Sequence, residues 1–209
     1  MKFKLTIHGQ EVPSREPKAM AQFANRSLTD NLGRAERSYV SEGIDAYFKG
    51  ETDRAIEKLM SALNINPRNA EACLYMARVC KMKNAPAIAI GYFDRAVEAD
   101  PNNSEARIER GLAVLEKRSG LWSDASNALA DFSTAFILNS NEVRALYYMG
   151  VCKHRMWDYG DALALFERYS ELAPIDILAA RELEIYREKT RTFGHYSDMS
   201  LMHRTFMYS

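Results

Sequence analysis

The sequence predicts an all-α fold, a solenoid of helix-turn-helix repeats with a short strand-like segment at the N-terminus. Three observations lead to this prediction, because self-similarity at a fixed period is typical of repeat proteins. An alanine recurs with steps of 34, 39 and 34 residues, at Ala55, Ala89, Ala128 and Ala162. A small residue upstream recurs with steps of 34, 34 and 39 residues, at Gly43, Ala77, Gly111 and Gly150. A proline follows the alanine in three units, at Pro67, Pro101 and Pro174.

Each unit is interpreted as two helices whose backbones approach closely. The small residue lies on the first helix and the alanine on the second, which lets the two helices pack tightly. A large apolar residue four positions after the alanine fills the space beside them, at Leu59, Phe93, Phe132 and Phe166. Proline ends the second helix, since it lacks an N–H and disfavours α geometry in the residue before it. One hairpin cannot bury its own apolar face, so we expect the units to stack; a helical bundle with accidental periodicity is the alternative.

The pattern resembles the tetratricopeptide repeat, a 34-residue unit with the signature W-x-x-L-G-x-x-Y, then A-x-x-x-F, then P. The fourth unit follows it with Leu146, Met149, Gly150, Lys153, Ala162, Phe166 and Pro174. The second unit follows it with Cys73, Met76, Ala77, Cys80, Ala89, Phe93 and Pro101. The resemblance covers four repeats, at 36–69, 70–103, 104–142 and 143–176. It implies that the helical hairpins stack into a right-handed superhelix.

The third repeat departs from the pattern in three ways. Its alanine-to-alanine step is 39 residues rather than 34, which places an insertion within KRSGLWSDASN. It carries Arg107 and Arg110 where apolar residues are usual, and Ser140 replaces the proline. We therefore expect a weaker core in this repeat. Leu121 and Trp122, in the insertion, either cap the lengthened hairpin or contact a partner.

Flanking segments are expected to cap the repeats, because the ends of a repeat array need a polar cover. In 17–35, Pro17 fits a helix start, and Met20, Phe23 and Leu28 are expected to face inward and cover repeat one. In 177–190, the spacing predicts a helix that covers repeat four. Its apolar face would consist of Ala179, Leu183 and Tyr186.

The two terminal segments have different patterns. Segment 1–16 alternates Phe3, Leu5 and Ile7 with polar residues, which predicts a strand that pairs with a partner sheet or with a hairpin segment near Val12. Segment 191–209 is rich in large apolar residues, unlike a disordered tail. These residues are Phe193, Tyr196, Met199, Leu201, Met202, Phe206, Met207 and Tyr208. We expect the tail to fold back on the repeats or to dock on another protein.

Composition argues against several functions. Lys plus Arg and Asp plus Glu are equal, at 28 each, so we expect neither nucleic acid nor an anionic membrane as the main partner. The N-terminus lacks the apolar region of a signal peptide, and no stretch approaches 18 consecutive apolar residues. The three cysteines lack C-x-x-C spacing, which favours a reducing compartment. The sequence therefore predicts a soluble, cytoplasmic protein that does not insert into a membrane.

No catalytic signature is present in the sequence: there is no glycine-rich phosphate loop, G-x-S-x-G elbow or H-E-x-x-H pair. The four histidines are scattered, and no metal site or cofactor is expected. Cys73, Cys80 and Cys152 fall at inward positions of first helices and are interpreted as small buried hydrophobes. The chain is not expected to be an enzyme.

The resemblance implies that the first helices of the repeats line a concave groove. Positions 2, 5, 9 and 12 of each first helix share one face because they step by 3, 4 and 3 residues. From these positions we expect a partner-binding groove formed by Val40, Ile44, Tyr47, Leu74, Arg78, Lys81, Ile108, Leu112, Leu115, Arg144, Tyr147, Val151 and His154. The alternative is that the apolar members only pack between neighbouring helices. A second contact is expected from Trp122, Phe193, Tyr196 and Phe206.

These features favour a non-catalytic protein–protein interaction scaffold, either an adaptor or a subunit of a larger assembly. The groove ligand would be a peptide, a helix or an assembly neighbour, or the chain's own C-terminal tail. The basic clamp by which some tetratricopeptide domains hold acidic chaperone C-termini does not match, since its positions fall on residues such as Val40, Ile44 and Glu105. A secretion-type chaperone that shields an apolar client segment is the alternative function.

Overall fold

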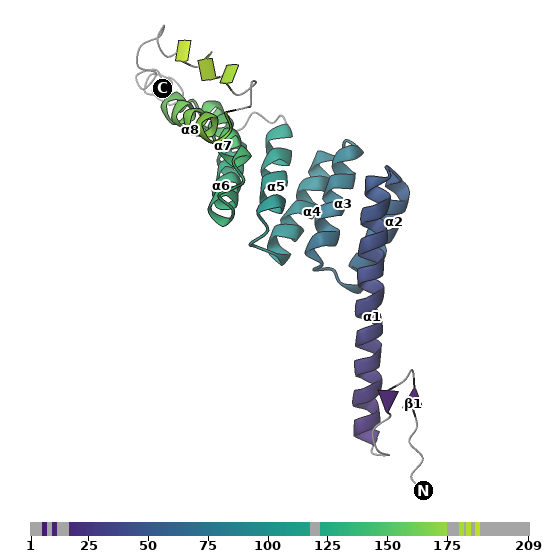
Figure 1. The fold of residues 1–209 in the computed structure, drawn as a ribbon. Coiled ribbons are helices and arrows are strands. Elements are labelled where there is room, and N and C mark those ends of the chain that lie inside the picture. Colours follow the sequence, from purple (N-terminus) through teal and green to yellow (C-terminus); the bar gives the residue numbers. More distant parts are fainter. Residues whose placement is uncertain are drawn as a thin grey trace, which may run out of the picture. The chain divides into compact units, whose positions relative to one another are not determined.

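The computed structural model describes residues 6–7, 10–11, 17–117, 122–174, 180–181, 183–184 and 187–188 (Figure 1). The chain divides into two compact units, Met1–Tyr75 and Met76–Ser209. Some predicted positions lie outside the described residues: Phe3, Leu5, Leu121, Ala179, Tyr186, and the tail 191–209 with Phe193, Tyr196 and Phe206. The side chains of Met20 and Phe23 also lie outside them.

The first unit begins with a two-stranded antiparallel sheet. Strand β1 (Thr6–Ile7) pairs with β2 (Gln10–Glu11), so that Thr6 lies opposite Glu11 and Ile7 opposite Gln10. The strand predicted around Ile7 is therefore present. Its partner is the segment that follows it in the same chain, which was one of the two partners expected.

A long helix, α1 (Pro17–Phe48), packs against α2 (Thr52–Ile65) to form repeat one. The sequence suggested a separate capping segment at 17–35, but the structure contains one continuous helix of 32 residues. Nothing between Pro17 and Phe48 ends a helix. This stretch contains no further proline, and a glycine such as Gly33 costs only about 1 kcal/mol relative to alanine. The expectation that Leu28 faces inward is wrong, since this side chain is 58% exposed.

Helix α3 (Ala70–Met82) begins in the first unit and ends in the second. The second unit continues with α4 (Pro86–Ala99), α5 (Ser104–Glu116), α6 (Trp122–Leu138), α7 (Arg144–Arg155) and α8 (Tyr159–Leu172). Helix α4 packs against α5, α5 against α6, α6 against α7 and α7 against α8, as Figure 1 shows. The largest side chains of this core include Phe93 and Phe132, which are fully buried. Repeats two, three and four are thus the helix pairs α3/α4, α5/α6 and α7/α8.

The glycine of the first helix packs directly against the large side chain predicted to lie beside it. A Cβ atom at Gly43 would lie 2.7 Å from Cγ of Leu59, and one at Gly150 would lie 2.7 Å from Cε1 of Phe166. Real Cβ atoms do not approach other atoms this closely, so the helices are nearer than an alanine would allow. The close helix approach predicted from the small residues is confirmed at these positions.

The turn between repeats is built by Asn and Asp side chains as well as by proline. The Oδ1 atoms of Asn66, Asp100 and Asn139 each accept a hydrogen bond from the backbone N–H two residues later, at 3.0, 3.2 and 3.2 Å. This Asx turn sets the chain direction locally. Repeat three keeps the turn at Asn139 although Ser140 replaces the proline, which explains why α6 ends at the expected place.

The residues described beyond α8 are helical at 180–181, 183–184 and 187–188. Leu183 is buried in a cluster with Ala162 and Phe166 of α8. Arg187 donates to the carboxylate of Glu167, also on α8, at 3.0 Å. The predicted contact of Leu183 with repeat four is therefore present.

Candidate functional site

The predicted groove positions of the first unit differ in their accessibility. Val40 and Leu74 are buried, so neither side chain is available to a partner in this conformation. Their inclusion in an open groove is corrected here: they serve the helix packing that was the alternative interpretation. Ile44 and Tyr47 are half-buried and retain accessible surface.

Tyr47 belongs to an aromatic cluster with Phe48 and Tyr75. The rings of Tyr47 and Tyr75 lie 5.5 Å apart, and Phe48 lies 5.2 Å from Tyr47 and 6.1 Å from Tyr75, all in edge-on geometries. Phe48 is 72% exposed although it is held by two aromatic neighbours. Edge-to-face aromatic pairs are favourable beyond their burial, so the cluster holds an apolar ring at the surface in a fixed position.

In the second unit, Ile108 and Leu115 are buried in the core of repeats three and four. The prediction that they line an accessible groove is corrected for the same reason as for Val40. Four other positions of this set are half-buried: Leu112, Tyr147, Val151 and His154. The Tyr147 ring lies 5.6 Å from that of Phe166 and 5.5 Å from that of Tyr169, so much of Tyr147 packs within repeat four.

The cations of the predicted groove are already paired within the second unit. Arg78 on α3 donates a hydrogen bond to Glu105 and lies 3.5 Å from the carboxylate of Glu109 on α5. Lys81 lies 3.4 Å from Glu109 and 3.5 Å from Glu116. An incoming carboxylate would have to displace these partners. Arg144 is more accessible, although it also donates to Glu142.

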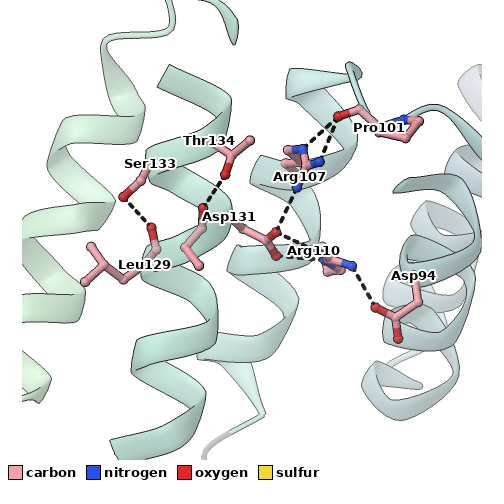
Figure 2. A network of polar contacts seen from close by, with 9 residues as sticks. Asp94, Pro101, Arg107, Arg110, Leu129, Asp131, Ser133 and Thr134 are labelled. Carbon is pink, nitrogen blue, oxygen red and sulfur yellow. Dashed lines mark hydrogen bonds and ion pairs between the residues drawn. The ribbon is translucent and has the colours of Figure 1, made fainter. Parts of the chain in front are cut away.

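Repeat three contains a polar network that the sequence did not predict (Figure 2). Arg110 donates from Nε to Oδ2 of Asp131 at 2.7 Å and from Nη1 to Oδ1 of Asp94 at 3.0 Å. It thereby joins α5 to both α6 and α4. Asp131 is only 5% exposed, and its hydrogen bonds raise the pKa of Arg110 above the ordinary value. Arg107 donates twice to the backbone carbonyl of Pro101, at 3.0 and 2.8 Å.

The arginines of repeat three therefore replace apolar packing with a paired network. A buried carboxylate is tolerated only where a cation and hydrogen bonds satisfy it, as Arg110 does here. The network borders a groove of about 510 Å³ that is also lined by Lys117 and Asp124. Because the arginines in the groove already have carboxylate or carbonyl partners, the geometry indicates a structural role for them.

Trp157 is a surface residue that the sequence analysis missed. It is 52% exposed and has a left-handed backbone, with φ of 63°. This conformation is costly for a bulky residue, and strained residues of this kind cluster at functional sites. The equivalent positions of repeats one and two hold Gly50 and Asn84, residue types that adopt the left-handed region readily. The sequence contained a signal for this residue, because Trp157 occupies a repeat position that holds glycine in repeat one and asparagine in repeat two.

The rings near Trp157 form a second aromatic group. Tyr159 lies 6.2 Å from Trp157 and 5.3 Å from His154, in edge-on geometry. Trp122, at the first residue of α6, is also more than half exposed. The Trp122 ring is therefore accessible, and its predicted contact with a partner stays a prediction.

Within the described part of the chain, no group of three or more His, Cys, Asp or Glu side chains is placed to hold a metal ion. The three cysteines are free thiols, and burial raises the pKa of Cys152 to about 12, which suits the predicted buried hydrophobe. None of the helices in the described ranges has the length and apolar character needed to cross a membrane.

The helix pairs, their small-residue contacts and their surface aromatics define a helical-hairpin repeat protein. The model of the tetratricopeptide repeat matches residues 49–107, which include α2, α3 and α4. The tetratricopeptide repeat predicted from the spacing of the small residues is thereby confirmed over residues 49–107.

Several solved structures share the fold at low identity. A MamA crystal structure is 23% identical, with 81% of this chain and 92% of that chain covered and a TM-score of 0.65. YrrB, described as a TPR protein with an unusual peptide-binding site, is 22% identical over 78% of this chain and 89% of its own, with a TM-score of 0.62. The first TPR of Spaghetti (RPAP3), bound to the HSP90 peptide SRMEEVD, is 20% identical over 58% and 93%, with a TM-score of 0.53. These similarities confirm the all-α solenoid class.

Proposed function

We propose that this chain is a non-catalytic protein-binding scaffold that holds a segment of another protein against the first helices of its repeats. The observation that carries the proposal is the aromatic cluster of Tyr47, Phe48 and Tyr75, which holds an exposed Phe48 at the surface. Aromatic residues dominate binding energy at protein interfaces because they bury a large area at a small entropic cost. Proteins of this fold that bind peptides, YrrB and the Spaghetti domain, give further support.

The preferred ligand of this surface would be apolar rather than acidic. The accessible parts of Ile44 and Tyr47 continue the apolar surface next to Phe48. We propose a partner segment that inserts an aromatic or aliphatic side chain beside Phe48.

Selection from a phage-displayed library of random peptides tests this proposal on the full chain. We expect enriched peptides to share a large apolar residue, and Phe48→Ser to weaken their binding by about tenfold or more, which corresponds to about 1.4 kcal/mol. Ile137→Ser is the matched control, because Ile137 on α6 is 81% exposed and lies in the other unit. Equal loss in the two variants, or no enrichment at all, would contradict the proposal.

Within this function we propose one of two roles, an adaptor or a subunit of a larger assembly. We propose a cytoplasmic setting for both roles because all three cysteines are free thiols. Deletion of 191–209 distinguishes the roles. An adaptor should remain monodisperse and lose only a transient ligand, whereas an assembly subunit should lose its complex. If the tail is itself the ligand of the groove, the deletion should instead strengthen peptide binding.

The alternative function, a chaperone that shields an apolar client segment, makes a different prediction. Ile44→Asp and Leu112→Asp place charges on the half-buried apolar surface of each unit. Under the chaperone hypothesis these changes should abolish the protection of an aggregating client, measured by light scattering. Unimpaired client solubility would exclude this function and leave the scaffold proposal in place.

A further inference from the structure

Helix α1 extends well beyond the helix it packs against. It contains 32 residues and α2 contains 14, so at 1.5 Å per residue α1 is about 27 Å longer. The end of the shared region is marked by Glu36, whose carboxylate accepts hydrogen bonds from Asn66 at 2.8 Å and Asn69 at 2.7 Å, just after α2. The residues of α1 before Glu36 therefore lie past the end of α2.

The apolar stripe that α2 covers continues onto this extension. Tyr39 and Gly43 face α2, since Lys58 lies 5.6 Å from the Tyr39 ring centre and Gly43 packs on Leu59. At about 100° per residue, Ala35, Leu32 and Leu28 fall on the same side of the helix as Tyr39. Leu28 and Leu32 are 58% and 45% exposed. An apolar stripe that extends past its partner helix is exposed to water, and a second helix packed on it would bury these side chains.

The charges of the extension lie away from this stripe. Arg26, Asp30 and Arg34 fall on the opposite side of the helix, about 140° or more from the line between the two leucines. The positions that flank the leucines are uncharged: Asn25, Thr29, Asn31 and Ala35. A helix with these flanks approaches an identical helix without repulsion between like charges.

The arrangement is also symmetric about Asp30. When two copies of the helix run antiparallel with Asp30 at the centre, Leu28 of one copy meets Leu32 of the other, and Thr29 meets Asn31. A two-fold interface requires such a self-complementary surface, in which residue i contacts j and j contacts i. Because α2 is antiparallel to α1, a second α1 in this direction occupies the line that α2 leaves empty.

We propose that residues 25–35 of α1 form the interface of an antiparallel homodimer, with Leu28 and Leu32 of one copy packed against Leu32 and Leu28 of the other. This proposal is independent of the ligand surface proposed above. The interface is short, so the dimer should dissociate on dilution.

Sedimentation velocity of the full chain over a dilution series tests the proposal. We expect the weight-average mass to rise from one chain to two, and Leu28→Glu with Leu32→Glu to hold the protein at the monomer mass. Ile137→Glu, a matched change at an exposed position of α6, should dimerise as the unchanged protein does. A monomer at all concentrations, or a dimer that survives the double change, would overturn the proposal. Circular dichroism checks that the helices are retained.

Disulfide cross-linking tests the direction of the pair and does not depend on the folding of the glutamate variant. A mixture of Leu28→Cys and Leu32→Cys chains should cross-link several-fold faster than either variant alone, because only the mixture brings the two thiols opposite each other. Asp30→Cys, on the far side of the helix, should cross-link slowly. Faster cross-linking within a single variant would indicate a parallel pair and refute the antiparallel model.

Discussion

Asp131 accepts two hydrogen bonds from the guanidinium of Arg110, at 2.7 and 2.5 Å, and these two residues occupy the same repeat positions as Lys58 and Glu42. In repeat one, the ion pair of Glu42 and Lys58 spans 3.1 Å with the charges exchanged between the helices. In repeats two and four, the same positions hold Met76 with Tyr92, and Met149 with Leu165. One pair of positions thus accommodates either an ion pair or an apolar contact.

This equivalence predicts the effect of breaking the pair in repeat three. Arg110→Met leaves Asp131 buried without its main cation, which should lower the free energy of unfolding by about 3–5 kcal/mol. The double change Arg110→Met with Asp131→Leu copies the residues of repeat four and should return to within about 1 kcal/mol of the unchanged protein. Urea unfolding followed by circular dichroism measures both. A double variant as unstable as the single one would show that the network is specifically required.

The related pair of repeat one should respond much less. Glu42 and Lys58 are more exposed, with side-chain exposures of 40% and 22%, and exposed ion pairs contribute only about 0–1 kcal/mol. Hydrogen bonds from Lys58 and Ser38 lower the pKa of Glu42, which shows that the pair is formed but not that it is strong. Glu42→Gln should therefore change the urea midpoint only slightly.

The glycines of the first helices should tolerate no added methyl group where they contact a large side chain. Gly150→Ala would place a Cβ atom 2.7 Å from the Phe166 ring, and such overpacking should destabilise the protein by about 1–3 kcal/mol. Gly91→Ala is the matched control, because nothing lies within 4 Å of a Cβ atom there, and it should stabilise α4 by about 0.5–1 kcal/mol. Thermal unfolding of both variants measures the difference. Equal effects would mean that helix propensity, not close packing, decides at Gly150.

Most of the fold could be predicted because its causes are local or periodic. The steps between small residues and the prolines located the helix pairs, and the structure has α2, α4 and α8 where they were expected. The continuous α1 could not be predicted from a cap pattern alone. Whether a helix continues past its partner depends on the absence of a breaker, and Gly33 alone is too weak a breaker.

The site was harder to predict than the fold. Leu74 and Ile108 have the same residue type and spacing whether they face a ligand or a neighbouring helix, so sequence alone does not distinguish burial from exposure. Arg107 and Arg110 were taken as a weak point of the core, because the partner of Arg110, Asp131, lies 21 residues away across the insertion. Trp157 was missed because its meaning depends on a backbone angle, although the comparison with Gly50 contained the signal.

The pair of Lys153 with Asp158 predicts a pH dependence of stability. Burial opposes ionisation of Asp158, but hydrogen bonds from Lys153 and from the backbone of Asp161 outweigh it, so the pKa of Asp158 is lowered. A carboxylate with a lowered pKa stabilises the fold above its unfolded pKa of about 3.9, and this contribution disappears as the pH falls through the folded value. The pKa of Lys153 is raised by its hydrogen bond to Asp158, so its contribution is lost only at high pH.

Lys153→Met removes this pair and leaves Asp158 as the N-terminal cap of α8. The difference in unfolding free energy between the unchanged protein and the variant should be constant near neutral pH. It should shrink as the pH falls below about 4 and as it rises above about 10.5, where the two groups become neutral. Urea unfolding at a series of pH values measures it. A difference that does not change with pH would show that Lys153 acts through packing of its side chain.

Substitution of Trp157 separates a role in stability from a role in binding. Trp157→Gly relieves a left-handed backbone that is unfavourable for a bulky residue by about 1–2 kcal/mol, and it loses an exposed ring whose aromatic contact with Tyr159 contributes about 0.5–1.5 kcal/mol. The variant should therefore be as stable as the unchanged protein or slightly more stable in thermal unfolding. If the strain is retained because the ring contacts a partner, the same variant should bind that partner more weakly. Trp157→Asn, which copies Asn84 of repeat two, should behave in the same way. A clear loss of stability in both variants would instead assign Trp157 to the packing of the α7–α8 turn.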